Sequence, residues 1–293
     1  APPWSRGLGD VYKRQGYLHI GGARTALFAW LFAKSQNGDC LLRIEDTDKE
    51  RSKDEYTTEI IESFKWLGVE FDNEVVYQSN NTDRYKEIID QLLDQGSAYI
   101  CKGEDLETDK KYRDQNLPRD NKTVVRFKMP EEGNTVYADI VKGQIEVANE
   151  QLDDFIIERS DGSATYNLCV VVDDLDSDIS HVIRGEEWLP SIPKHIALYQ
   201  AFGWSPPFFG HLPLLLNDDK TKLSKRKNDV SVASYIDKGY TKEALITLRN
   251  MVKNAKNSNI SVRVGIQCVW GCIYDGRPNQ KNLMKLKAIN QIQ

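Results

Sequence analysis

Apolar residues recur with helical spacing in three stretches of the first hundred positions, and short apolar runs separate these stretches. In the second stretch Ile60, Ile61, Phe64 and Leu67 fall on one face of a helix with 3.6 residues per turn. Glycine follows the first and third stretches, as is typical where helices end. The predicted elements are helices over 23–36, 53–67 and 82–95 and strands over 40–44 and 74–78. Because strands alternate with helices, we expect a parallel sheet covered by helices.

The alternation breaks between Ser97 and Ala164 and resumes afterwards. Within this segment short apolar runs and turn residues predict strands, with Asp161-Gly162 as a hairpin turn. The strands predicted there cover 123–128, 145–147 and 155–158. Beyond the segment the predicted elements are strands over 168–172, 179–184 and 208–216 and a helix over 192–202. The pattern therefore predicts an α/β fold that is interrupted by an α+β insertion. Ala1–Gln15 shows no period of either kind, which predicts a loop or an irregular terminus.

Composition narrows the class of protein. With 293 residues, of which 40% are hydrophobic and 28% charged, the chain can bury a sizeable core and is unlike disordered proteins. No apolar run approaches the ~18 residues of a membrane span, so we expect no membrane partner. Five scattered cysteines without a signal peptide indicate free thiols in the cytoplasm. Cys268 and Cys272 have three residues between them and no second pair, so we expect no metal site.

A glycine-rich turn, Gly16–Gly22, precedes the first predicted helix. Within it His19, Gly21 and Gly22 would present imidazole and backbone N–H donors at a helix N-terminus, where a phosphate binds favourably. The turn matches neither the dinucleotide-binding fingerprint nor the P-loop. Taken alone, it is equally compatible with an ordinary turn.

Charged residues end two of the predicted strands. Glu45 follows the strand over 40–44, at the edge of the sheet where ligands of open α/β folds bind, and could hold an ammonium group. The alternative is a helix N-terminus capped by Thr47 or Asp48.

Arg184 ends the strand over 179–184 and precedes a glycine. Its guanidinium could clamp a carboxylate in bidentate fashion. A salt bridge to Glu186 or Asp173 is the alternative.

The net charge of −5 argues against a nucleic-acid partner only as an average. Lys220–Lys227 contains five cations in eight residues. Beside a phosphate site, such a loop can neutralise the charge of a departing pyrophosphate, and the alternative is a solvated surface.

The glycine-rich turn, the two charged strand ends and the lysine-rich loop follow one another along the chain. Taken together in this order, they resemble the catalytic portion of bacterial-type glutamyl-tRNA synthetase, a class I aminoacyl-tRNA synthetase. His19-Ile-Gly-Gly22 is similar to the HIGH signature of that class, and Lys222-Leu-Ser-Lys-Arg226 is similar to its KMSKS signature. The more specific matches are Gly16–Phe28, Arg43–Asp48, Thr165–Asp174, Val182–Trp188 and Lys222–Val232. The resemblance extends from Gly16 to about Ile246.

The resemblance implies a Rossmann-type parallel sheet with helices, interrupted by an α+β insertion that binds the acceptor end of tRNA-Glu. It implies that L-glutamate and ATP, which arrives with Mg²⁺, form glutamyl-adenylate and pyrophosphate. The glutamyl group is then transferred to the 3′ end of the tRNA. We expect a cytoplasmic monomer. The implied segments are 1–15 (unmatched), 16–96 (first catalytic half), 97–164 (acceptor-binding insertion), 165–216 (second catalytic half), 217–246 (signature loop and start of the stem-contact region) and 247–293 (unmatched).

The resemblance also implies a role for each matched residue. His19, Gly21 and Gly22 would hold ATP. Lys225 would stabilise the departing pyrophosphate and Lys222 would support the loop, so His19, Lys222 and Lys225 are the catalytic candidates.

The remaining candidates bind the amino acid. Glu45 would bind the α-ammonium group of glutamate, Arg184 would pair with its side-chain carboxylate or the neighbourhood of that group, and Tyr166 would line the pocket.

The chain departs from the family pattern near its first residues. The family has an Arg-x-Ala-Pro-Ser-Pro-Thr-Gly segment that ends at the position of Gly16. Its arginine falls on Gly9 and its serine on Lys13. We therefore expect the first strand and part of the glutamate pocket to be missing, and we interpret residues 1–15 as foreign sequence.

Two further departures follow. Cys101 matches one zinc-ligand position of some members, but Gly103 stands where a second cysteine would be, so we expect no zinc. Thr247–Gln293 is polar and without pattern, and we interpret it as a truncated or frameshifted end that lacks the anticodon-binding domain.

Two other functions stay open. One is that of the shorter relative that glutamylates a modified base of tRNA-Asp and has no anticodon-binding domain. The other is an inactive fragment that binds nucleotide or RNA, which the sequence at 9–15 favours. A small-molecule adenylyltransferase would share the phosphate-binding turn but would leave Arg43–Asp48 unexplained.

Overall fold

The computed structural model describes residues 8–13, 17–46, 54–115, 117–215 and 231–241. The chain forms two compact units. Unit 1 consists of Ala1–Gly16, Arg24–Thr58 and Glu70–Pro213, and unit 2 of Tyr17–Ala23, Glu59–Val69 and Leu214–Gln293. No helix in the described part of the chain is both long enough and apolar enough to cross a bilayer.

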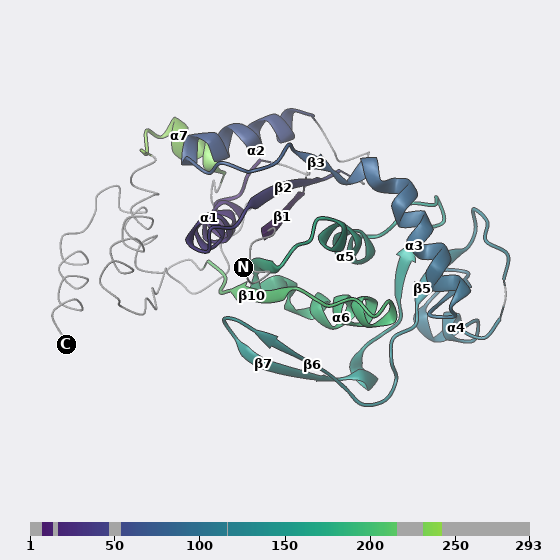
Figure 1. The fold of residues 1–293 in the computed structure, drawn as a ribbon. Helices are drawn as coiled ribbons and strands as arrows, with labels where there is room; N and C mark the ends of the chain where they lie inside the picture. Colours follow the sequence, from purple (N-terminus) through teal and green to yellow (C-terminus); the bar gives the residue numbers. More distant parts are fainter. Residues whose placement is uncertain (1–7, 14–16, 47–53, 116, 216–230, 242–293) are drawn as a thin grey trace. The chain divides into compact units, whose positions relative to one another are not determined.

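A seven-stranded sheet with the order β3-β2-β1-β9-β10-β6-β7 forms the centre of unit 1 (Figure 1). Its strands are β1 (Leu8–Lys13), β2 (Cys40–Glu45), β3 (Val76–Tyr77), β6 (Asn134–Asp139), β7 (Gly143–Ala148), β9 (His181–Gly185) and β10 (Phe208–Leu212). All neighbours from β3 to β6 are parallel, and only β7 runs antiparallel to its neighbour β6. This confirms the predicted α/β fold with a Rossmann-type parallel sheet.

The described helices are α1 (Ile20–Ser35), α2 (Asp54–Leu67), α3 (Thr82–Asp94), α4 (Leu106–Lys110), α5 (Tyr166–Asp176), α6 (Ile192–Ala201) and α7 (Val232–Asp237), with short 3₁₀ turns η1 (Gln78–Asn81), η2 (Asn149–Gln151) and η3 (Glu186–Ser191). α1, α2, α3 and α6 lie close to where the apolar spacing predicts helices. α1 begins in unit 2 and ends in unit 1, whereas α2 begins in unit 1 and ends in unit 2. The sequence predicted neither α4 nor α7, because each is shorter than two helical turns and shows no readable period.

The prediction that the first strand is missing is wrong. Leu8–Lys13 forms β1, in register with the whole of β2 from Leu8 opposite Cys40 to Lys13 opposite Glu45. A parallel ladder is made by backbone N–H and C=O groups, and this stretch contains no proline to remove a donor. The strand therefore forms although the family's residues are absent from it.

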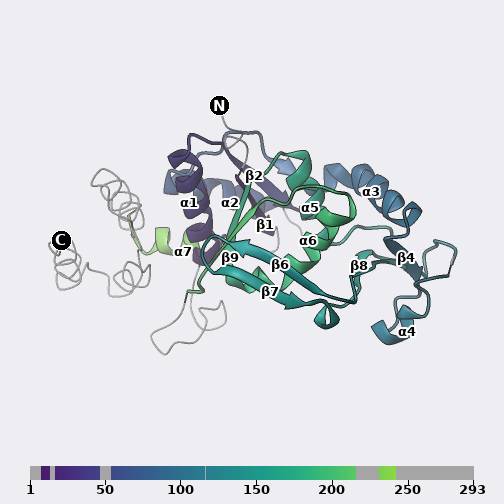
Figure 2. The ribbon, with the colours of Figure 1, turned by 60° about the horizontal axis from the view of Figure 1, so that its bottom comes forward.

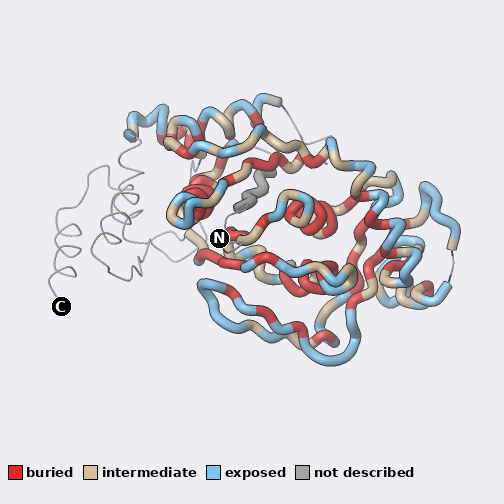
Figure 3. Tube along the Cα trace, viewed as in Figure 1, coloured by how far each residue is buried: buried red, intermediate tan, exposed pale blue. Residues whose placement is uncertain are grey.

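The prediction of a strand over 168–172 is also wrong, because this run lies in the middle of helix α5. Residues 168–174 are all buried, so the helix has no solvent-exposed face in this stretch (Figure 3). A helix that is buried on all sides shows no 3.6-residue period, and a short continuous apolar run cannot then be told from a buried strand. α3, α5 and α6 share one core with β5, in which Leu92, Val125, Cys169 and Leu198 are completely enclosed.

The segment 97–164 is divided between two sheets. β4 (Ala98–Cys101), β5 (Val124–Phe127) and β8 (Phe155–Glu158) form a separate antiparallel sheet in the order β4-β5-β8. The hairpin of β6 and β7 instead extends the main sheet beyond β10 (Figure 2). An α+β segment within the α/β fold is thus present, and it reaches Arg184's neighbourhood through the end of β6.

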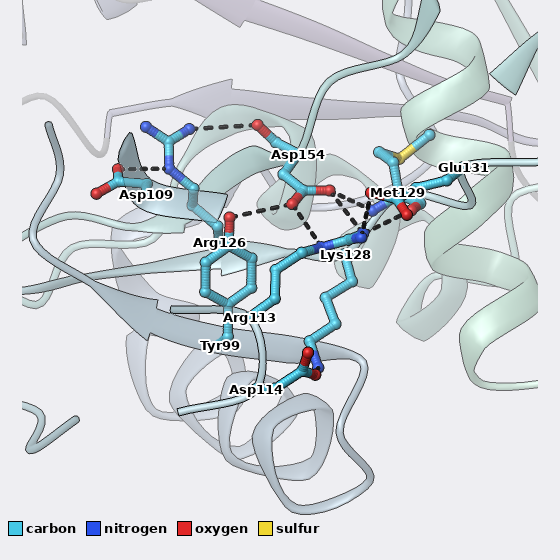
Figure 4. Close-up of polar contacts among 9 residues, drawn as sticks. All are labelled: Tyr99, Asp109, Arg113, Asp114, Arg126, Lys128, Met129, Glu131 and Asp154. Carbon is cyan, nitrogen blue, oxygen red and sulfur yellow. Dashed lines mark hydrogen bonds and ion pairs between the residues drawn. The ribbon is translucent and has the colours of Figure 1, made fainter. Parts of the chain in front are cut away.

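A buried group of charges holds the smaller sheet together (Figure 4). The Asp154 carboxylate accepts hydrogen bonds from the Tyr99 hydroxyl at 3.0 Å and from the Met129 backbone N–H at 2.8 Å. It also pairs with the Arg113 guanidinium at 2.9 Å. Burial and the Asp154 carboxylate raise the pKa of Tyr99, which keeps its hydroxyl a donor. Beside this group the Arg126 guanidinium pairs with the buried Asp109 at 2.9 Å.

Replacing Asp154 with asparagine is expected to lower the free energy of unfolding by about 2–3 kcal/mol. An amide has one acceptor oxygen, so it cannot replace both carboxylate oxygens toward a cation and two neutral donors. Urea unfolding would measure the change. The exposed neighbour Asp153 supplies the matched control, because Asp153→Asn should change stability by less than about 0.5 kcal/mol. Equal effects of the two substitutions would contradict this assignment.

Candidate active site

Arg184 lies at the carboxyl end of β9, and its guanidinium is surrounded by partners. Its Nη1 donates to the Tyr166 hydroxyl at 3.1 Å, and its Nη2 donates to the Ser191 hydroxyl at 2.9 Å. The Trp188 ring lies under the guanidinium, 5.8 Å from the Arg184 Cζ to the ring centroid. Only 9% of Arg184 is exposed. The result is a cation held in one orientation at the ligand-binding edge of a parallel sheet.

The other two predicted substrate-binding residues, Tyr166 and Glu45, lie in the same unit as Arg184. Tyr166 is the first residue of α5, and its ring centroid lies 4.9 Å from that of Trp188. Glu45 is the last residue of β2 and is half-buried. Burial raises the pKa of Tyr166 to about 12, the Arg184 charge opposes this rise, and the Glu45 charge adds to it. The Tyr166 hydroxyl is therefore influenced by a cation, Arg184, and by an anion, Glu45, which lie at the ends of different strands.

Gly185 leaves space for a side chain of the turn that follows it. A Cβ at this position would collide with the carboxylate of Glu187, which lies against the Gly185 backbone. The turn η3 can then follow the strand at once and bring Trp188 and Ser191 to the guanidinium. The Glu187 carboxylate is the end of a flexible side chain, so a larger residue at position 185 would require it to move aside.

The alternative partners that we considered for Arg184 are bound elsewhere. Asp173 pairs with Arg43 at 3.4 Å, and Glu186 pairs with Lys142. Asp173 also accepts hydrogen bonds from Gln78 at 2.7 Å.

Arg43 also forms a buried ion pair with Asp174, the residue that follows Asp173. The distance from the Arg43 Nη2 to the Asp174 Oδ1 is 2.8 Å. Burial would lower the pKa of Arg43, but the charges of Asp174 and Asp173 raise it. Arg43 of the Arg43–Asp48 motif therefore holds β2 against α5, while Glu45 of the same motif lies at the strand end.

Asp46, the next residue of that motif, is buried and accepts hydrogen bonds from the Ser79 backbone N–H at 2.8 Å and the Ser79 hydroxyl at 2.7 Å. It thereby fixes η1 beside the end of β2. The suggested caps Thr47 and Asp48 lie outside the described residues.

The predicted ATP-binding residues lie in unit 2, at the first turn of α1. The Gly21 N–H donates to the Nδ1 atom of His19 at 2.9 Å. A Cβ at Gly21 would lie 3.0 Å from that nitrogen, so a larger residue would require the imidazole to shift by a few tenths of an ångström. Because Nδ1 accepts this bond, a neutral His19 carries its proton on Nε2. Gly22 is in the same turn. A donor from the imidazole thus joins the backbone N–H groups of a helix N-terminus.

The glycine-rich turn pairs within unit 2 with residues that come about 200 positions later, shortly after the lysine-rich loop. His19 forms an antiparallel bridge with Ser231, and the Val232 N–H donates to the Leu18 carbonyl at 2.9 Å. Ser231 directly follows the lysine-rich loop. Lys222 and Lys225 themselves lie outside the described residues, so their roles stay predictions.

Metal ligands are not gathered in the described part of the chain. Its His, Cys, Asp and Glu side chains form no group of three or more that could hold a metal ion. Burial raises the pKa of Cys101 to about 11, which favours the neutral thiol. The absence of zinc stays a prediction.

Sequence reasoning missed three residues that contact Arg184 directly or through a partner. Ser191 lies in η3, His211 lies opposite Arg184 on β10, and Asp139 ends β6. The place of His211 within the strand predicted over 208–216 was the one available signal. Nothing in the sequence connects Asp139 with Arg184, which lies 45 positions further along, or with His211, which lies 72 positions further along.

Comparisons with known proteins agree with this geometry. A family model for the catalytic domain of class I tRNA synthetases (E and Q) matches residues 13–119 and 103–267. The chain is 47% identical over 247 residues to the glutamate–tRNA ligase of Lawsonia intracellularis, covering 79% of this chain and 53% of that protein. It is 47% identical over 253 residues to that of Chromobacterium violaceum, covering 79% and 55%. The chain thus spans about half the length of the curated relatives it matches.

Among solved structures, the chain is similar to a glutamate tRNA ligase from Elizabethkingia meningosepticum, crystallised in complex with its amino acid. The TM-score is 0.75 at 33% sequence identity, over 83% of this chain and 59% of that chain.

Proposed function

The chain belongs to the family of class I tRNA synthetase catalytic domains for glutamate and glutamine, and from this premise we propose that it ligates L-glutamate to tRNA-Glu. The first step would form glutamyl-adenylate and pyrophosphate from glutamate and ATP. In the second, a hydroxyl of the tRNA 3′-terminal ribose would attack the activated carbonyl. The observation that carries the proposal is the group formed by Arg184, Tyr166 and Glu45. The Arg184 guanidinium donates to the Tyr166 hydroxyl, and the charge of Glu45, at the end of β2, acts on the same hydroxyl.

Glutamate would be recognised by charge at both of its ends. The Arg184 guanidinium would pair with the side-chain carboxylate, and Glu45 would pair with the α-ammonium group. Arg184 is already oriented by Tyr166 and Ser191, so little side-chain entropy would be lost on binding. Glutamine would present a neutral amide to the same guanidinium and would bind less tightly.

ATP would be held by the first turn of α1. The Gly22 backbone N–H and the Nε2–H of His19 would donate to its phosphate oxygens, while the Gly21 N–H, which donates to the His19 Nδ1, would orient the imidazole. Mg²⁺ would accompany ATP and neutralise phosphate charge. Lys225 would stabilise the negative charge that develops as pyrophosphate leaves, with Lys222 supporting the loop.

Lys225→Ala is expected to slow adenylate formation by about tenfold or more, with less than about a threefold change in ATP affinity. A group that acts on the developing pyrophosphate charge contributes to the transition state rather than to ground-state binding. Single-turnover adenylate formation and ATP titration would measure the two quantities. Lys227→Ala, in the same loop but outside the signature, is the control. Equal losses in rate and ATP affinity would show that Lys225 acts in binding.

Charging assays with tRNA-Glu and tRNA-Asp test the function as a whole. The 47% identity to glutamate–tRNA ligases favours tRNA-Glu as the substrate. Charging of tRNA-Asp alone would instead support the paralogue that modifies a base of that tRNA. We further propose that the enzyme works in the cytoplasm as a monomer, which size-exclusion chromatography with light scattering would test.

A further inference from the structure

Asp139, His211 and Arg184 form a buried chain of hydrogen bonds across three neighbouring strands. Arg184 on β9 and His211 on β10 are register partners, and Asp139 ends β6, which pairs with β10. The Asp139 Oδ2 lies 2.6 Å from the His211 Nδ1, and the Arg184 Nε lies 3.2 Å from the His211 Nε2. His211 is completely buried and Asp139 is 3% exposed, so water does not compete for these bonds.

The partners of Asp139 determine which nitrogen of His211 carries the proton. The Asp139 Oδ1 accepts hydrogen bonds from the backbone N–H groups of Val141 at 2.9 Å, Lys142 at 2.8 Å and His211 at 3.3 Å. The Oδ2 is thereby left to accept from the His211 Nδ1–H. A neutral His211 then has a lone pair on Nε2, which accepts from the Nε–H of Arg184. Burial lowers the pKa of His211 although the bond to Asp139 opposes this shift, so the neutral ring is favoured.

We propose that the Asp139–His211 pair is a positioning device for Arg184, and that the tautomer of His211 sets the orientation of the guanidinium that receives the glutamate side-chain carboxylate. The proposal rests on the proposed function. Tyr166 and Ser191 hold the Nη atoms of Arg184, whereas His211 alone among the described residues accepts from its Nε. Neither Asp139 nor His211 needs to touch the amino acid. The inserted segment, through the last residue of β6, would thus influence amino-acid recognition.

Asp139→Asn tests the tautomer directly. The three backbone N–H groups at Oδ1 require the amide oxygen of the asparagine, which turns its NH₂ group toward the His211 Nδ1. That nitrogen must then accept, so the proton moves to Nε2 and faces the Nε–H of Arg184. The hydrogen bond between Arg184 and His211 is then replaced by a contact between two donors, the Nε–H of Arg184 and the Nε2–H of His211. We expect glutamate affinity to fall by about tenfold or more, with less than about a threefold change in ATP affinity.

His211→Gln separates positioning from support of the β6–β7 turn. A glutamine amide oxygen can take the place of Nε2 and accept from Arg184 whatever stands at position 139. We expect this variant to lose no more than about threefold in glutamate affinity. In its background Asp139→Asn should cost less than about threefold further. If Asp139 merely supported the backbone of Val141 and Lys142, its substitution would cost the same in both backgrounds.

Side-chain ¹⁵N spectroscopy provides a readout that does not depend on activity. The wild-type protein should show His211 protonated at Nδ1, and Asp139→Asn should show it protonated at Nε2 with a shifted Arg184 Nε–H signal. The signals are assigned from their loss in His211→Gln. Asp154→Asn is the matched control, because Asp154 is also buried and also accepts from a backbone N–H, yet should leave the tautomer and glutamate affinity unchanged.

The outcomes are distinguishable. An unchanged tautomer in Asp139→Asn, or an equal loss of glutamate affinity in both backgrounds, would overturn the positioning role. If the wild-type chain neither binds glutamate nor supports glutamate-dependent exchange of pyrophosphate into ATP, the proposed function fails. The His211 and Arg184 signals would still decide whether Asp139 controls the guanidinium.

Discussion

Arg184→Met is expected to lower glutamate affinity by about 100-fold or more and to leave ATP affinity within about threefold of its original value. Methionine is an unbranched apolar side chain that replaces the aliphatic part of the arginine and removes its charge and all of its donors. Truncating one partner of a buried, hydrogen-bonded charge pair costs about 2–5 kcal/mol, much of it from the charge that is left unpaired. Here that charge would be the side-chain carboxylate of the bound glutamate.

Titration calorimetry with glutamate, and with a non-hydrolysable glutamyl-adenylate analogue, measures the loss. Arg184→Lys is the matched variant, because lysine retains the charge but has neither the Nε–H that contacts His211 nor the planar fork. We expect its affinity to lie between those of the wild-type protein and Arg184→Met. The loss in Arg184→Met should be smaller for glutamine than for glutamate, since glutamine brings no charge. Equal losses for both amino acids would mean that Arg184 does not read the side-chain carboxylate.

Arg43→Met is expected to lower the free energy of unfolding by about 3–5 kcal/mol at pH 7. Arg43 is 4% exposed and pairs with two adjacent carboxylates, Asp173 and Asp174, from α5. Without it two like charges would remain buried next to each other, and removal of one member of a buried ion pair is strongly destabilising. Urea unfolding measures the change.

Arg84→Met is the matched control for this stability prediction. Arg84 also pairs with two carboxylates, those of Glu87 and Asp176, but these contacts lie at the surface. Surface pairs contribute about 0–1 kcal/mol, so the control should lose no more than that. A comparable loss in Arg43→Met would show that the buried pair contributes as little as the exposed one.

The deficit of Arg43→Met should shrink as the pH falls. Burial raises the pKa of Asp174 even in the wild-type protein, and the Arg43 charge is the largest opposing effect. Without Arg43 the pKa of Asp174 in the folded state rises further above its value of about 3.9 in the unfolded chain. A folded state that binds protons more tightly than the unfolded state gains stability on acidification. Unfolding curves at pH 7 and pH 5 test this, and a deficit that is constant or grows toward pH 5 would contradict it.

The errors of prediction share one physical origin. Helix α3 has one exposed face and one buried face, so the spacing of its apolar residues predicts its ends within one residue of the observed Thr82–Asp94. Helix α5 has no solvent-exposed face between residues 168 and 174, because the core surrounds it there. Its apolar run was therefore predicted as a strand. β1 was missed for a related reason. Its place in the sheet depends on the backbone ladders of β2 and β9, and those neighbours are supplied by distant parts of the chain.

The candidate site also has features that the sequence determined and features that only the tertiary structure decided. The sequence by itself determined the family, the α/β order, and the types and positions of His19, Glu45, Tyr166 and Arg184, since local motifs carry that information. Only the tertiary structure decided which charges meet. It paired Asp173 with Arg43 rather than Arg184, brought Ser231 to His19, and placed His211 and Asp139 behind the guanidinium. The reason is that strand register sets neighbours across a sheet, and register arises from backbone pairing and burial rather than from separation along the chain.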